Sequence, residues 1–87
     1  MEAERGEELF MLEKAGEIDS LNYQVPLVLS MTPKVVISID FVYRENGEWI
    51  HEDTKGVLTR DFRTKMAWLK EKYGIEVKLT GSTRRVR

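Results

Sequence analysis

The segment KVVISIDFVYRENGEWIHEDTK, residues 34–55, constrains the fold more than any other part of this 87-residue chain. Its first ten residues are rich in β-branched and aromatic side chains, a composition typical of a strand. Asn46-Gly47 is a dipeptide favoured in two-residue hairpin turns, because both turn positions require a positive φ. The sequence therefore predicts strands over residues 34–43 and 49–55 that pair antiparallel around this turn.

Two carboxylates meet across the predicted hairpin. Asp40 and Asp53 lie at similar distances from the turn, so antiparallel pairing places them nearly opposite each other, about 4.5–5.5 Å apart at Cβ. Lys55 lies two residues beyond Asp53 and faces the same side. Because facing carboxylates repel unless something positive lies between them, this arrangement indicates a cation site. The alternative is a structural role, in which Asp40 ends its strand in an ion pair with Lys55 or another cation.

Before the hairpin, residues 2–15 are rich in Glu and Leu and predict a helix that ends at Gly16. Gly6 within this helix is explained if the sheet approaches it closely. Residues 21–30 predict a strand, in which Pro26 favours an edge position or a bulge, because proline cannot donate to the ladder.

After the hairpin, residues 60–73 predict a second helix that is capped by Gly74, and residues 75–79 predict a last strand. One apolar stripe at helical spacing supports this helix and is expected in the core: Phe62, Met66, Leu69 and Tyr73. The order α-β-β-β-α-β predicts a single α/β domain over residues 1–79, with helices packed on a mixed sheet. Residues 80–87 are expected to form a basic flexible tail.

Composition limits the chemistry that the chain can perform. Cysteine is absent and His51 is the single histidine, which excludes disulfides, thiolate nucleophiles and clusters of histidine ligands. A bound metal must then be held mainly by carboxylate oxygens, which suit Mg²⁺ or Mn²⁺. No apolar run approaches the ~18 residues of a membrane span, and the acidic amino terminus does not resemble a signal peptide, so a cytoplasmic location is expected.

Charge is distributed unevenly along the chain. Residues 1–54 contain 4 Lys or Arg and 12 Asp or Glu, whereas residues 55–87 contain 10 and 3. A basic half could follow a phosphate backbone while an acidic half supplies metal ligands. An ordinary mixed surface, in which folding interleaves the two halves, is the alternative.

The run IDFVYRENGEWIHEDTKG resembles the phage-associated branch of the PD-(D/E)XK nuclease superfamily, small endonucleases related in fold to archaeal Holliday-junction resolvases and restriction enzymes. The likeness extends over most of the chain. EAERGEELFMLEKAGEI is similar to the family's first helix, NYQVPL to its first strand, and TRDFRTKMAWL to the basic helix after the D-x-K strand. The resemblance implies a restriction-endonuclease-like core and Mg²⁺- or Mn²⁺-dependent hydrolysis of DNA, including branched or otherwise non-B DNA, in a bacterial or phage-infected cell.

The resemblance also implies roles for individual residues. Asp40 and Asp53 match the two metal-binding acids, with the Thr54 backbone carbonyl as a further ligand. Lys55 matches the lysine that positions or activates the attacking water. Glu2 matches an acid that many members carry on the first helix as a metal or water ligand.

DNA contacts are expected from the basic half of the chain. Lys65 matches a recurrent basic position of the family's second helix, and Gln24 matches a recurrent polar position that we expect to be structural or to contact the backbone. Charge alone adds four candidates for phosphate contacts: Arg60, Arg63, Arg84 and Arg85.

The sequence departs from the family pattern in two places. Ile39 replaces the proline of the eponymous PD pair, a change that the superfamily tolerates. Members usually carry a basic segment before the first-helix acid, and here Glu2 is nearly terminal. Either the chain is truncated, or Glu4 or Glu7 substitutes, or the site works with fewer ligands.

Other singled-out side chains have plainer explanations. His51 could act as a general base, but a structural or solvated histidine is the favoured interpretation. Trp49 and Trp68 could stack on bases, but packing in the core or at its rim is favoured. Glu52 is expected on the face opposite Asp53, at the surface or in an ion pair.

These observations predict a Mg²⁺-dependent DNA endonuclease, and a homodimer because cutting two strands requires two sites. Two alternatives retain the fold without catalysis: a DNA-binding module, and a fragment of a larger nuclease.

Overall fold

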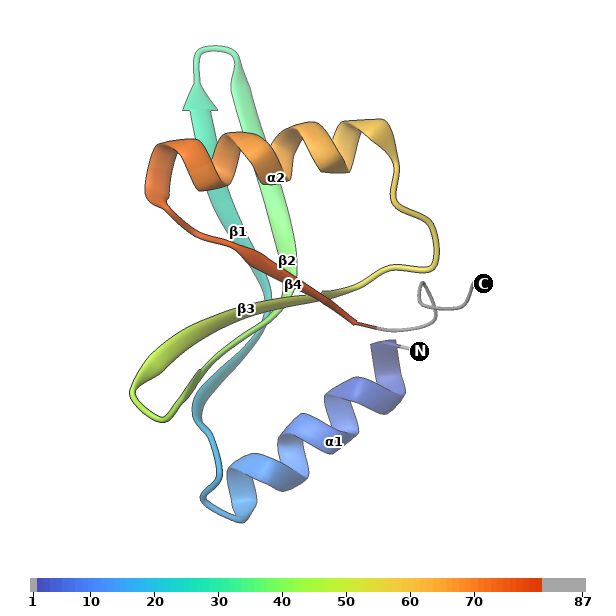
Figure 1. Cartoon of the computed structure of the whole chain (residues 1–87), viewed down its shortest axis with the longest axis vertical. Helices are drawn as coiled ribbons and strands as arrows, with labels where there is room; N and C mark the ends of the chain where they lie inside the picture. The colour runs from blue at the N-terminus through green and yellow to red at the C-terminus, as the bar shows by residue number, and fades with distance from the viewer. Residues whose placement is uncertain (1, 81–87) are drawn as a thin grey trace.

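The computed structural model describes residues 2–80 and confirms the predicted order of helices and strands (Figure 1). The elements are α1 (Glu2–Lys14), β1 (Asp19–Met31), β2 (Lys34–Glu45), β3 (Glu48–Thr54), α2 (Arg60–Tyr73) and β4 (Val77–Thr80). The strands form one four-stranded sheet in the order β1-β2-β3-β4. The first three are antiparallel neighbours, and β4 lies parallel to β3, so the chain is α/β with a mixed sheet.

Figure 1 shows α2 crossing the half of the β1–β2 hairpin that is nearest its turn, with α1 beside the other end of the sheet. Each helix covers its own hydrophobic cluster. Leu69 of α2 packs with Ile37 and Ile39 of β2, whereas Leu9 of α1 packs with Phe41 and Tyr43 of the same strand. Residues 39–43 of β2 are all buried, which makes this segment the centre of the fold.

The β2–β3 turn sets the register of the sheet. Asn46 and Gly47 have φ values of 53° and 80°, and Glu45 pairs with Glu48 across them, as a two-residue hairpin turn requires. The predicted hairpin is confirmed. β3 begins and ends one residue earlier than expected, at Glu48 and Thr54.

The edge position of β1 explains its proline. β1 is the first strand of the sheet, and Pro26 lies opposite Ser38 of β2 with its other side unpaired by any strand of residues 2–80. Gly6 is also explained, because a Cβ there would lie 3.4 Å from Cε1 of Phe41. The close approach expected between α1 and the sheet is therefore present.

The second helix has the predicted bounds, Arg60–Tyr73. The Thr59 side chain accepts a hydrogen bond from the Phe62 N–H at the start of the helix, and Gly74 ends it with a φ of 72°. The apolar stripe is in the core except at Tyr73, which is 51% exposed and donates its hydroxyl hydrogen to the Val28 carbonyl. Tyr73 therefore belongs to the rim of the core, which corrects the prediction.

The last strand is Val77–Thr80 and not residues 75–79, because its register is set by parallel pairing with β3 from His51 to Thr54. Thr80 thus belongs to the domain, and the predicted tail loses its first residue. The rest of that tail lies outside the described residues. Neither described helix is long and apolar enough to cross a membrane.

Candidate functional site

A row of three polar residues crosses the centre of the sheet: Gln24 of β1, Asp40 of β2 and Asp53 of β3. The ladder pairs on either side place Gln24 opposite Asp40. The last pair of the β2–β3 ladder, Phe41 with Glu52, places Asp53 opposite Asp40 on the other side. Asp40 and Asp53 are buried, with exposed fractions of 8% and 0%. The predicted neighbourhood of the two aspartates is confirmed.

Both aspartate carboxylates accept hydrogen bonds from the neighbouring strand where β3 separates from β2. Asp53 Oδ1 accepts from the Asp40 backbone N–H at 2.8 Å. Asp40 Oδ2 accepts from the backbone N–H and from the hydroxyl of Thr54, each at 3.0 Å. Carboxylate oxygens thus replace the backbone carbonyls that would continue the ladder. Both side chains are held rigidly by the end of the hairpin.

Lys55 supplies the positive charge of the site. Its ammonium Nζ lies 2.8 Å from Asp53 Oδ2 and 4.3 Å from the centre of the Phe62 ring in α2. The lysine pairs with Asp53, so the predicted alternative of an Asp40–Lys55 pair is not found. Apart from this ammonium, no donor of residues 2–80 serves Asp53 Oδ2.

The electrostatics of Asp53 reflect its burial. Burial raises the pKa of Asp53, and the neighbouring charge of Asp40 acts in the same direction. Lys55 and the Asp40 N–H act in the opposite direction without cancelling the effect. The charged form of Asp53 is therefore costly in the folded chain unless more positive charge is brought to it.

Gln24 connects a third acid to the row. Its Nε2 donates to Asp40 Oδ1 at 3.2 Å and also to Oε2 of Glu2, at the start of α1. Glu2 therefore reaches Asp40 through an amide and does not contact it directly. Gln24 has a φ of 51°, in the left-handed region that non-glycine residues rarely adopt. The resemblance marked Gln24 as a recurrent polar position, but the sequence did not indicate this side-chain bridge or its backbone conformation.

The oxygen atoms around Asp40 and Asp53 decide whether the site can hold a divalent cation. No three His, Asp or Glu side chains of residues 2–80 are gathered around one point that a metal ion could occupy. Two carboxylates remain, and each of their oxygens can accept from two directions. Asp53 Oδ2 is approached by the Lys55 ammonium alone and Asp40 Oδ1 receives one hydrogen bond, so both keep coordinating capacity. This fits Mg²⁺, which is commonly held by one or two carboxylates together with waters and substrate phosphates.

The predicted DNA-binding residues of α2 are exposed near this site. Arg60 and Arg63 lie exposed in the first turns of the helix, on either side in sequence of Phe62, whose ring Lys55 contacts. Lys65 forms an ion pair within the helix, because its ammonium lies 3.4 Å from Asp61 Oδ2. The two remaining candidates, Arg84 and Arg85, lie outside the described residues.

A buried hydrogen-bond network around Glu52 could not be predicted from the sequence. Glu52 points away from Asp53, as expected, but it is completely buried. Arg5 of α1 donates to both of its carboxylate oxygens, and the hydroxyls of Tyr43 and Thr80 also donate to it. Burial alone would raise the pKa of Glu52, but these hydrogen bonds outweigh it and leave that pKa below its usual value. The ion pair was foreseen as one option, and the surface position was wrong.

His51 and the tryptophans lie away from the aspartates. His51 lines a cavity of about 480 Å³ with Trp49 and the end of α2 at Gly74, and burial lowers its pKa. This placement agrees with a structural histidine. Trp49 and Trp68 are 54% and 38% exposed, so both belong to the surface or the rim and not to the core.

Comparisons with protein-family models, with curated proteins and with solved structures gave no match for this chain.

Proposed function

We propose that the chain is a divalent-metal-dependent DNA endonuclease of the PD-(D/E)XK type, with a restriction-endonuclease-like core. The observation that carries the proposal is the convergence of Asp40, Asp53 and Lys55 at the end of the β2–β3 hairpin. There, two buried carboxylates stand beside one ammonium group, which lies 2.8 Å from Asp53 Oδ2 and is the one group of residues 2–80 that approaches this oxygen. The D-x-K spacing and the α-β-β-β-α-β order are consistent with it.

Phosphodiester hydrolysis needs positive charge at the scissile phosphate and an activated water. Asp40 and Asp53 would hold Mg²⁺ or Mn²⁺, which supplies that charge and lowers the pKa of a bound water when present. Thr54 anchors Asp40 through two hydrogen bonds, and its carbonyl is the proposed further ligand. Glu2, held by Gln24, is the proposed outer acid of the site. Lys55 would stabilise the negative charge that gathers on the phosphate during attack.

The direct test is cleavage of supercoiled plasmid and of four-way junction DNA with Mg²⁺, with Mn²⁺ and with EDTA. Cleavage that requires either metal and stops in EDTA is the expected result. Cleavage unaffected by EDTA, or no cleavage of either DNA with any metal, would contradict the proposal.

Lys55→Gln is expected to lower the cleavage rate about 100-fold, the usual cost of removing one group that stabilises transition-state charge. Glutamine retains a polar side chain of similar reach, and Lys55 is partly exposed, so the fold should persist. Single-turnover cleavage rates measure the effect. Lys70→Gln is the matched control, because that lysine forms an exposed ion pair with Glu76 and should be dispensable. Equal cleavage rates for the two variants would show that Lys55 does not stabilise the transition state.

Arg60→Ala/Arg63→Ala is expected to weaken DNA binding and to reduce its salt dependence. Each lost phosphate contact lowers the slope of log K against log salt by about 0.9, so the double variant should lose up to about 1.8. Binding isotherms for one duplex at several salt concentrations give this slope. Arg44→Ala serves as the control, because Arg44 pairs with Asp19 on the edge of the sheet. A slope unchanged by the double substitution would place the DNA elsewhere.

A second function, a DNA-binding module without catalysis, has one observation in its favour. Asp40 Oδ2 is fully occupied by Thr54, and no group of three acidic or histidine side chains is assembled in the described part of the chain. This function requires salt-sensitive DNA binding that is unaffected by EDTA, with no cleavage under any of the conditions above. A homodimer is proposed only for the nuclease, because cutting both strands requires two sites.

A further inference from the structure

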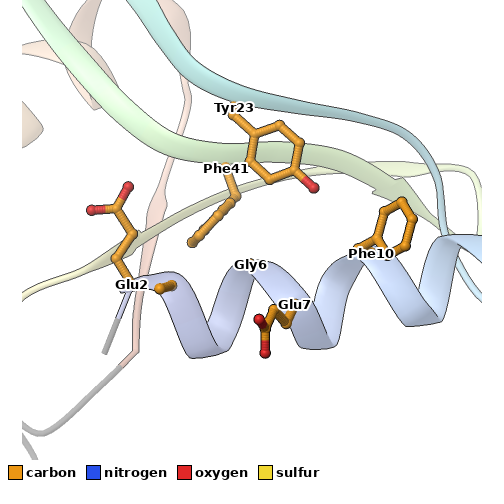
Figure 2. Close-up of a pocket in the computed structure, with 7 residues that line it drawn as sticks. Glu2, Gly6, Glu7, Phe10, Tyr23 and Phe41 are labelled. Carbon is orange, nitrogen blue, oxygen red and sulfur yellow. The ribbon is translucent and has the colours of Figure 1, made fainter.

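An aromatic groove runs between α1 and the strands β1 and β2, as Figure 2 shows. Its volume is about 520 Å³, within the range of small-molecule sites. Tyr23 and Phe41 project into it from the two strands, and Phe10 lines it from the helix. The nuclease chemistry proposed above does not use this groove.

The exposed aromatic surface of the groove comes from Tyr23 and Phe10. Phe41 is 2% exposed and forms the floor, with the Tyr23 ring edge-on to it at a centroid distance of 5.8 Å. Tyr23 and Phe10 are 50% and 48% exposed, a large apolar surface for a small domain to leave in water. Gly6 keeps the helix close to this floor, because a Cβ there would already contact Phe41 at 3.4 Å.

One end of the groove is joined to the row of polar residues in the sheet. Glu2 lines the groove, and its Oε2 accepts from Gln24 Nε2. The same amide nitrogen donates to Asp40 Oδ1. Two hydrogen bonds therefore connect the groove, through Glu2 and Gln24, to Asp40, one of the carboxylates that are proposed to hold the cation.

We propose that this groove receives an unpaired base of the bound DNA, an inference that rests on the proposed nuclease function. Aromatic side chains stack on bases of any sequence, since every base has a π face. The base, and not the backbone, is the part that fits. Glu2 carries a carboxylate at the groove, which repels phosphates but accepts hydrogen bonds from exocyclic amino groups. A base inside a duplex is already stacked and paired, so the site selects DNA with an unpaired position.

The test compares two single-stranded oligonucleotides with the same number of phosphates, one of adenosine and one of abasic sites, binding to the full chain in EDTA. The wild-type chain is expected to bind the adenine strand about 10-fold more tightly, as one stacked base provides. Phe10→Ala and Tyr23→Leu should each remove most of this difference and leave the affinity for the abasic strand unchanged. Met11→Ala is the control, because Met11 neighbours Phe10 on α1, is 63% exposed and does not line the groove.

Equal affinity for the two strands, or equal weakening of both by Phe10→Ala, would overturn the proposal. So would a drop in molar mass on Phe10→Ala in light scattering, because the groove would then hold a second copy of the chain. The outcome is separable from that of the nuclease test. Base-dependent binding without metal-dependent cleavage would support base binding in the groove and contradict the nuclease function. Metal-dependent cleavage without base-dependent binding would support the nuclease function and contradict base binding in the groove.

Discussion

Asp53→Asn is expected to lower Mg²⁺-dependent DNA cleavage by about 1000-fold or more while the chain remains folded. Asparagine retains an oxygen that can accept from the Asp40 N–H, the contact that holds residue 53 at the end of the ladder. It removes the negative charge of Oδ2, the buried oxygen that faces the Lys55 ammonium. A factor of 1000 corresponds to about 4 kcal/mol of lost transition-state stabilisation, a reasonable loss for a displaced metal ion.

The same substitution distinguishes a metal ligand from a structural carboxylate. Burial raises the pKa of Asp53, so its charged form is disfavoured in the folded state when no cation is added. In EDTA at neutral pH, Asp53→Asn should therefore be at least as stable as the wild type. Mg²⁺ should raise the free energy of unfolding of the wild type, by about 2.7 kcal/mol at 100 times its Kd, and should leave the variant unchanged.

Urea unfolding with and without Mg²⁺ measures both stabilities, and single-turnover cleavage measures the activity. Asp61→Asn is the matched control, because Asp61 is an exposed aspartate paired with Lys65 and should retain cleavage and the response to Mg²⁺. If Asp53→Asn loses several kcal/mol in EDTA, the aspartate pair serves the fold. If the variant cleaves at the wild-type rate, Asp53 is not part of the chemistry.

The hairpin could be predicted because its register depends on local chemistry. A two-residue turn at Asn46-Gly47 fixes every cross-strand pair of β2 and β3, so the proximity of Asp40 and Asp53 follows from counting residues. The bounds of α2 were equally predictable, since its apolar stripe and Gly74 are local signals. Structural features that depend on residues close in sequence, or on a strict periodicity of apolar residues, could be predicted from the sequence alone.

The remaining features depend on how distant segments pack. Gln24 bridges Glu2 and Asp40 only because α1 begins beside β1, and its positive φ is a conformation that strand periodicity does not indicate. Strand alternation correctly placed Glu52 on the face opposite Asp53. It could not show that Arg5 of α1 would meet that carboxylate and allow it to be buried.

Arg5→Met is expected to lower the free energy of unfolding by about 3–5 kcal/mol, the usual cost of leaving one member of a buried ion pair unpartnered. Glu52 is completely buried and depends on Arg5 for both of its charged hydrogen bonds. A chain of 87 residues is expected to have roughly 4–13 kcal/mol of stability in total, so the loss would be a large part of it. Arg44→Met is the control, because its pair with Asp19 is exposed on both sides and should contribute at most about 1 kcal/mol.

The pH dependence identifies the cause of this loss. In the wild type, hydrogen bonds hold the pKa of Glu52 below its usual value of 4.5, so the pair stabilises the fold above that value and is lost as the pH falls through the lowered pKa. Without Arg5, burial is expected to raise the pKa of Glu52, and the carboxyl then takes up a proton at a higher pH than in the wild type. The gap in stability between Arg5→Met and the wild type should therefore narrow as the pH is lowered from neutral.

Glu52→Gln in the Arg5→Met background provides the decisive comparison. Glutamine removes the unpaired charge but can still accept from the Tyr43 and Thr80 hydroxyls, so it should restore part of the stability at neutral pH. Urea unfolding of the wild type and of the single and double variants, at neutral and acidic pH, measures both effects. A gap that is constant with pH and unchanged by Glu52→Gln would show that Arg5 acts through packing of its aliphatic stem. The attachment of α1, and with it the position of Glu2, would then not depend on the buried charge.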